Sequence, residues 1–61
     1  MIKVNVYRSA IIDNYGLKQS ILFMDELEKW DTTVPRKNLY DMYYDKDVLD
    51  MLFKQSMEYH K

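Results

Sequence analysis

The chain has 61 residues, with nine Lys or Arg against ten Asp or Glu and a formal net charge of -1. This length allows one small domain, and we expect residues 1–61 to form it. The near-neutral charge lacks the basic excess expected of a nucleic-acid-binding protein. Because no cysteine is present, disulfides, thiolate metal sites and a thiol nucleophile are excluded.

Large side chains are frequent in the composition. Hydrophobic residues make up 48% of the sequence, which is too many for a disordered segment. A single Gly accompanies six Tyr and five Met, so a glycine-rich phosphate-binding loop is excluded. The longest apolar run, residues 21–24, is far too short to span a bilayer. The N-terminal residues do not resemble a signal peptide, and we therefore expect a cytoplasmic protein.

The first third of the chain alternates apolar and polar residues, beginning with Ile2, Val4 and Val6. A period of two with β-branched residues predicts a strand over residues 1–12. Residues 13–16 contain the only Gly and predict a turn, after which a return strand would run over residues 17–23.

The result is a β-hairpin over residues 2–23, with Arg8 on its apolar face. We expect the Arg8 guanidinium to reach solvent or to pair with an acid of the helical half, because burying it unpaired is costly. A competing interpretation makes residues 18–31 one helix. We rank it second because its apolar residues lie on nearly every side.

Residues 25–60 favour helices. Asp25 and Glu28 have the spacing of a capping box and predict a short helix that ends near residue 31. Thr33 is the expected N-cap of a helix over residues 35–44. A helix over residues 46–60, capped by Asp45, would follow. The expected fold is α+β of order ββαα, with a β-hairpin, a short helix and one or two C-terminal helices.

Catalytic and metal-binding patterns are missing from the sequence. The only His, His60, lies next to the end of the chain and has no group to orient it as a base. The spacing of Asp45, Asp47 and Asp50 departs from a calcium loop, which needs Gly where Asp50 stands. We therefore expect no enzyme activity, no cofactor and no metal.

Acids and aromatic residues concentrate in the middle of the chain. Residues 25–50 hold eight acids and a net charge of -4. Helix caps and a solvated surface account for many of them, and the Tyr residues could pack with their hydroxyls at the rim of the core. However, Tyr, Trp and Met are also typical of the centres of protein interfaces. The candidate partner-binding residues are Trp30, Tyr40, Asp41, Tyr43, Tyr44, Asp45 and Asp47.

These features favour a non-catalytic protein-binding module, a small inhibitor or adaptor that blocks a basic or apolar patch on a larger protein. Residues with AT-rich codons outnumber those with GC-rich codons, which suggests a phage or another mobile element as the source. One alternative is a nucleic-acid-binding transcriptional regulator that uses the two C-terminal helices, with Arg36 and Lys37 on phosphate. Another is an oligomeric structural subunit that pairs through the hairpin edge.

Overall fold

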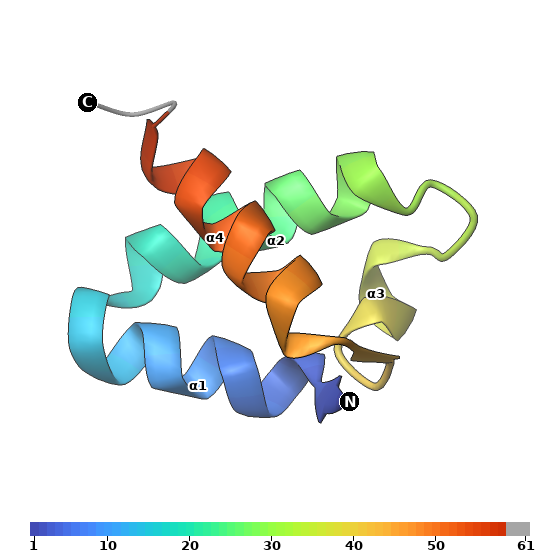
Figure 1. Ribbon diagram of the computed structural model, residues 1–61, viewed down its shortest axis with the longest axis horizontal. Helices are drawn as coiled ribbons and strands as arrows, with labels where there is room; N and C mark the ends of the chain where they lie inside the picture. The colour runs from blue at the N-terminus through green and yellow to red at the C-terminus, as the bar shows by residue number, and fades with distance from the viewer. Residues whose placement is uncertain (59–61) are drawn as a thin grey trace.

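The computed structural model describes residues 1–58, and within this range it contains four helices and one two-stranded antiparallel sheet (Figure 1). In chain order the elements are β1 (Ile2–Lys3), α1 (Val4–Tyr15), α2 (Leu17–Trp30), α3 (Arg36–Leu39), β2 (Tyr43–Tyr44) and α4 (Lys46–Glu58). Helices predominate, so the expected α+β class holds only in the coarse sense that a small sheet accompanies them.

The predicted β-hairpin over residues 2–23 is wrong, and the chain forms a helical hairpin there instead. Val4 and Ile11 lie two helical turns apart on one face of α1 and are both buried, whereas Val6 is 62% exposed. The alternation of apolar and polar residues therefore does not mark a strand here. β-Branched residues can still form a helix, because each costs only a few tenths of a kcal/mol, roughly, in that conformation. The competing interpretation of a helix over residues 18–31 is confirmed by α2.

Gly16 alone connects α1 to α2. Its φ of 99° and ψ of 166° reverse the chain in a conformation that L side chains rarely adopt. Its amide donates to the Ile12 carbonyl at 3.0 Å, and its carbonyl accepts from the Ser20 amide at 3.4 Å. The turn predicted at residues 13–16 is thus confirmed as a reversal, although it joins helices rather than strands.

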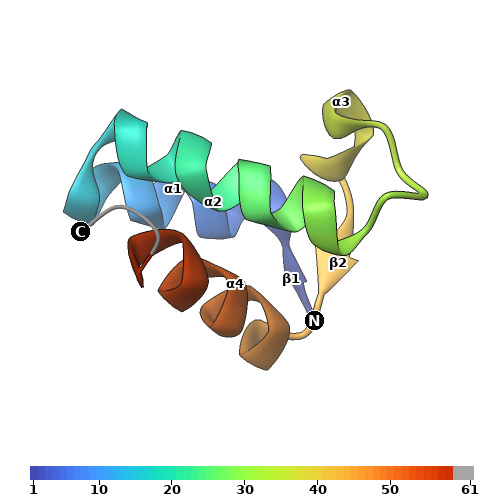
Figure 2. The same cartoon turned by 90° about the horizontal axis from the view of Figure 1, so that it is seen from above.

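The chain returns to the N-terminus of α1 through the segment around β2 (Figure 2). Ile2 pairs with Tyr44 and Lys3 with Tyr43 in the two-residue ladder. The amide of Val4 then donates to the Met42 carbonyl at 2.9 Å, and the amide of Asn5 donates to the Tyr40 carbonyl at 3.1 Å. These first helical amides have no partner within their own helix, so the returning segment satisfies them.

The helix predicted over residues 35–44 is also wrong, because α3 stops at Leu39. The amides of Asp41 and Met42 donate to the carbonyls of Asn38 and Leu39, in tight turns that lead into β2. Pro35, not Thr33, precedes the first residue of α3. Similarly, Asp25 does not start a helix but lies inside α2.

The predicted start of the last helix is confirmed. The Asp45 carbonyl accepts hydrogen bonds from the amides of Val48 and Leu49, at 3.0 and 3.1 Å, as an N-cap residue does. The end predicted at residue 60 lies outside the described residues. None of the helices within residues 1–58 has the length and apolar character needed to cross a membrane.

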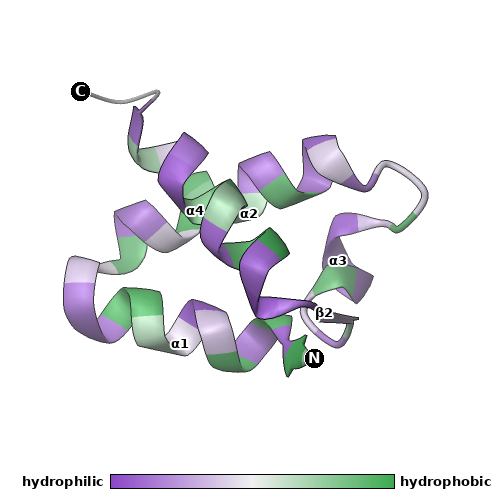
Figure 3. Cartoon of the chain, viewed as in Figure 1, coloured by the Kyte–Doolittle hydropathy of each residue, from purple (hydrophilic) through white to green (hydrophobic). Residues whose placement is uncertain are grey.

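The core lies where α4 crosses the helical hairpin. Apolar and polar residues are interspersed along the helices (Figure 3). Ser20 and Ser56 are fully buried, and each hydroxyl donates to a carbonyl of its own helix at 2.6 Å. Gln19 links α2 to α4 by donating to Ser56 Oγ at 3.1 Å. The buried hydrophobic residues are Val4, Ile11, Phe23, Met24, Leu27, Leu39, Tyr44, Leu49 and Leu52.

Candidate protein-binding surface

The seven predicted binding residues lie on the side of the molecule where β2, the end of α2 and the start of α4 meet (Figure 2). Six of them follow each other within residues 40–47, and Trp30 joins them through its contact with Tyr44. The structure thus brings the set together but gives its members different roles. We call this region the β2 surface; its exposed aromatic members are Trp30 and Tyr43.

Tyr44 anchors this region to the core. Its ring is only 8% exposed, and its hydroxyl donates to Asp31 Oδ2 at 2.7 Å. The other oxygen, Asp31 Oδ1, accepts from Thr33 Oγ1 at 2.6 Å and from the Thr33 amide at 3.3 Å. Tyr44 was predicted as a contact residue, but its burial makes it a support for the surface rather than a part of it.

The charges and burial in this network shift the pKa of both partners. Burial, followed by the hydrogen bond to the Asp31 carboxylate, raises the pKa of Tyr44 to about 12. The hydrogen bond from Thr33, followed by that from Tyr44, lowers the pKa of Asp31. Near neutral pH the phenol is therefore a donor and the carboxylate an acceptor, which keeps the connection between α2 and β2 intact.

Trp30 is one of the two half-exposed aromatic residues of the β2 surface. It is the last residue of α2 and is 50% exposed. Its ring meets the ring of Tyr44 edge-on, with centroids 5.8 Å apart and an interplanar angle of 77°, a geometry that aromatic pairs prefer. The indole is thus held from behind by a buried ring while half of the residue's surface remains accessible.

Tyr43 lies on the opposite face of the strand from Tyr44, because successive side chains in a strand alternate. It is 55% exposed and pairs across the ladder with Lys3. Lys3 in turn lies 3.6 Å from a carboxylate oxygen of Asp41, which is itself largely exposed. Tyr43 and Asp41 are therefore both accessible to a partner.

Tyr40 is mostly committed to contacts within the fold. It packs partly buried against the core, and the Arg8 guanidinium lies over its ring at 5.3 Å from the centroid. Arg8 was expected to reach solvent or to pair with an acid, and a cation–π contact takes the place of either. Tyr40 therefore contributes less accessible ring than its predicted role requires.

Asp45 and Asp47 complete the acidic part of the surface. Both are exposed, and Asp47 lies in the first turn of α4, where a negative charge is favourable. Neither carboxylate is drawn into the core, so both are available to attract a cationic partner.

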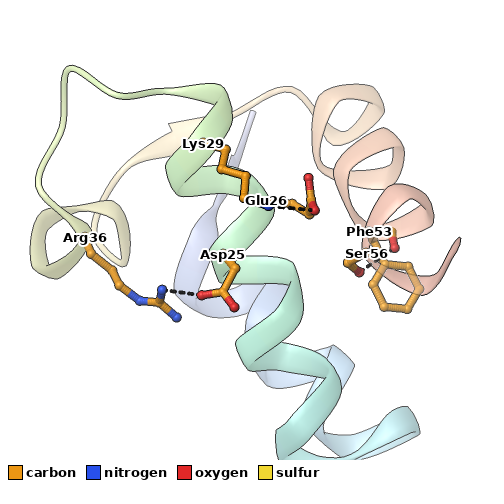
Figure 4. A network of polar contacts seen from close by, with 6 residues as sticks. All are labelled: Asp25, Glu26, Lys29, Arg36, Phe53 and Ser56. Atoms are coloured by element: carbon orange, nitrogen blue, oxygen red, sulfur yellow. Dashed lines mark hydrogen bonds and ion pairs between the residues drawn. The ribbon is translucent and has the colours of Figure 1, made fainter. Parts of the chain in front are cut away.

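The start of α3 is attached to α2 by an ion pair that sequence reasoning did not single out (Figure 4). Arg36 Nη1 lies 2.5 Å from Asp25 Oδ1 and 3.7 Å from Glu28 Oε2. The hydrogen bond to Asp25 is the main cause of the raised pKa of Arg36. This contact positions the loop between Trp30 and α3, and with it one border of the β2 surface.

Asp31 and Thr33 support the β2 surface through hydrogen bonds, but neither was among the predicted binding residues. The signal was present in the sequence, because an Asp two residues before a Thr just after a helix end is typical of a local side-chain turn. What the sequence did not indicate was that Tyr44, 13 residues further on, shares this carboxylate.

Residues 1–58 contain no group of three or more His, Asp or Glu residues that could hold a metal ion. His60 lies outside the described residues. No family model matches the chain, and no curated protein or solved structure matches it either. Functional inference therefore depends on the geometry of the surfaces themselves.

Proposed function

We propose that the protein is a non-catalytic protein-binding module, a small inhibitor or adaptor in the cytoplasm that engages a larger protein through its β2 surface. The observation that carries this proposal is Trp30, half-exposed yet held edge-on against the buried ring of Tyr44. A large aromatic side chain that is already immobilised loses little entropy on binding, which favours its use as an anchor.

The surroundings of Trp30 support a partner with a patch that is both apolar and basic. Tyr43 adds a second accessible ring on the other face of β2, while Asp41, Asp45 and Asp47 supply exposed negative charge. Such an arrangement would use the rings for affinity and the carboxylates for orientation and rate of association. Binding would act by covering a site on the larger protein.

The two alternative functions depend on secondary-structure elements that are much shorter in the fold than the sequence predicted. The regulator needed two C-terminal helices, but α3 has only four residues. The oligomeric subunit needed the edge of a hairpin, and the strands of the observed sheet have two residues each.

Affinity purification with the full chain tests the proposal, and the structure determines which variants are informative. Trp30→Ala with Tyr43→Ala removes the two exposed rings and leaves every buried residue unchanged. Ile21→Ala is the matched control, because Ile21 is also on α2 and is 47% exposed. We expect the double variant to lose the specific partner, with a fall in affinity of about 30-fold or more, and the control to retain it. Equal recovery with all three proteins would refute the β2 surface as the binding site.

A further inference from the structure

A second candidate site lies away from the β2 surface, in a hollow between α1 and α4. Its volume is about 280 Å³, just below the range of about 300–1,000 Å³ that encloses small molecules. This size suits a single side chain of a partner better than a drug-sized ligand. The lining residues are Tyr7, Ala10, Ile11, Asn14, Tyr15, Asp50 and Phe53.

The walls of the hollow are aromatic. The rings of Tyr15 and Phe53 lie 5.0 Å apart at 56°, and Tyr15 is 58% exposed. Tyr7 provides a third ring, which packs against buried Phe23 at a centroid distance of 5.2 Å. Flat ring faces next to a carboxylate are the surroundings that attract organic cations.

The polar atoms of the hollow are predominantly hydrogen-bond acceptors. The Asn14 amide nitrogen donates one of its two protons to the Ala10 carbonyl at 2.8 Å, and the side-chain oxygen of Asn14 can accept a bond from a ligand. Tyr7 gives its only hydroxyl proton to Asp50 Oδ1 at 2.5 Å, so the phenolic oxygen can only accept further bonds. The Asp50 carboxylate is a third acceptor.

Asp50 remains ionised and can exchange its surface partner. The hydrogen bond from Lys46, followed by that from Tyr7, lowers the pKa of the Asp50 carboxyl group. Lys46 Nζ lies 2.8 Å from Asp50 Oδ2, but the lysine side chain is 67% exposed. Exposed pairs at this helical spacing contribute only a few tenths of a kcal/mol, roughly, so an incoming cation can replace Lys46.

We propose that this hollow binds the guanidinium group of an arginine side chain from a partner polypeptide. A guanidinium carries five donors in one plane and stacks on aromatic rings, which matches several acceptors set beside flat ring faces. The chain already seats one guanidinium in this manner, that of Arg8 over Tyr40. The proposal uses none of the β2 surface residues, so either site can fail without the other.

The direct test is a titration of the full chain with N-acetyl-arginine amide, followed by the NMR signals of the Tyr7, Tyr15 and Phe53 rings. We expect saturable shifts at these rings and none at Trp30. N-acetyl-citrulline amide has nearly the same shape without the charge and should bind at least about tenfold more weakly. Equal shifts with citrulline, or with N-acetyl-lysine amide, would overturn the guanidinium assignment.

Three variants locate the site. Asp50→Asn should weaken arginine binding by about tenfold or more, whereas Asp47→Asn, which removes the same charge from the same helix outside the hollow, should change it less than about twofold. Asn14→Ala keeps α1 helical and should weaken binding several-fold, even if Asp50→Asn proves unfolded. Equal losses in the two Asp variants, or no loss with Asn14→Ala, would refute the site.

Lys46→Ala should increase the affinity for arginine. Misfolding of the variant would not produce such an increase. The substitution removes the competitor that occupies Asp50 Oδ2. We expect arginine to bind about two- to fivefold more tightly in this variant. Unchanged or weaker binding would show that the Asp50 carboxylate does not receive the guanidinium.

Discussion

Two Tyr–Asp pairs lie within residues 1–58, and they differ in what surrounds the carboxylate. At the β2 surface, Tyr44 donates to Asp31, whose other oxygen is occupied by neighbouring Thr33. In the hollow between α1 and α4, Tyr7 donates to Asp50, whose other oxygen is held only by exposed Lys46.

The same pair of side chains can thus serve different purposes. Around Asp31 every partner is local or buried, so the pair fastens β2 to the end of α2 and supports the exposed Trp30. Around Asp50 one partner is a flexible surface side chain, so the pair keeps an acceptor that another cation can reach. The exposure of the second partner of the carboxylate decides between a support and a binding site.

The largest expected effect on stability is a difference between substitutions at Tyr44 and at its neighbour Tyr43. Tyr44→Ala removes a ring that is 8% exposed and should lower the free energy of unfolding by about 3 kcal/mol. Tyr43→Ala, at a position 55% exposed, should change it by less than about 0.5 kcal/mol. Denaturant unfolding of both variants measures the difference, and similar losses would contradict the alternation of the two side chains.

A change at Gly16 should disturb the hollow more than the β2 surface. The Gly16 backbone has φ 99° and ψ 166°, while an added Cβ would meet no atom within 4 Å. Gly16→Ala therefore costs backbone strain alone, about 1–3 kcal/mol of unfolding free energy. We expect NMR shift changes at Tyr15 and Phe53 but not at Trp30. Ser9→Ala, an exposed site in α1, is the control, and an equally small loss in both would show that the reversal is unstrained.

The dependence of protein stability on pH should reflect both Tyr–Asp pairs. Since the pKa of Tyr44 is raised to about 12, its contribution to stability is complete below the unfolded value of about 10 and is lost as the pH rises towards 12. The raised pKa of Tyr7 acts in the same direction. The pKa values of Asp31 and Asp50 are lowered, so their contributions are complete above about pH 4 and are lost at more acid pH.

Absorbance of the tyrosinates during an alkaline titration measures the first effect. Tyr44→Phe should remove one late-ionising phenol from this titration. A late phase of unchanged amplitude in the variant would mean that Tyr44 is not protected by burial and by Asp31.

The smallest expected effect is that of Lys46. Its side chain is 67% exposed, so Lys46→Ala should alter the free energy of unfolding by at most about 0.5 kcal/mol. Denaturant unfolding at low salt checks this value. A loss above 1 kcal/mol or so would mean that Asp50 depends on Lys46 as Asp31 depends on its own partners, and the contrast between the two pairs would disappear.

Much of the local chain geometry was predictable. The single Gly correctly marks the reversal at Gly16, and Asp45 correctly precedes the last helix. The hairpin error arose because Ile2, Val4 and Val6 fit a period of two over a short stretch. The wider spacing of Val4, Tyr7, Ile11 and Tyr15 fits a helix and would have favoured the correct structure.

The candidate sites depended on contacts that no local pattern contains. Trp30, Tyr43 and the exposed acids were predictable as surface residues, but the burial of Tyr44 was not, because adjacent strand residues differ only in the face to which they point. Tyr7 and Asp50 are 43 residues apart in sequence, and their meeting depends on how α4 crosses the helical hairpin.

The sequence by itself determined that this is a small cysteine-free chain with one glycine reversal, helix-forming later segments and more aromatic residues than its core can hold. Only the tertiary structure decided that the first two segments are helices, which tyrosines are buried and which carboxylates they share. The physical reason is a difference in free energy. Helix and strand propensities differ by roughly tenths of a kcal/mol per residue, whereas burying one large side chain stabilises the fold by about 1.5–3 kcal/mol.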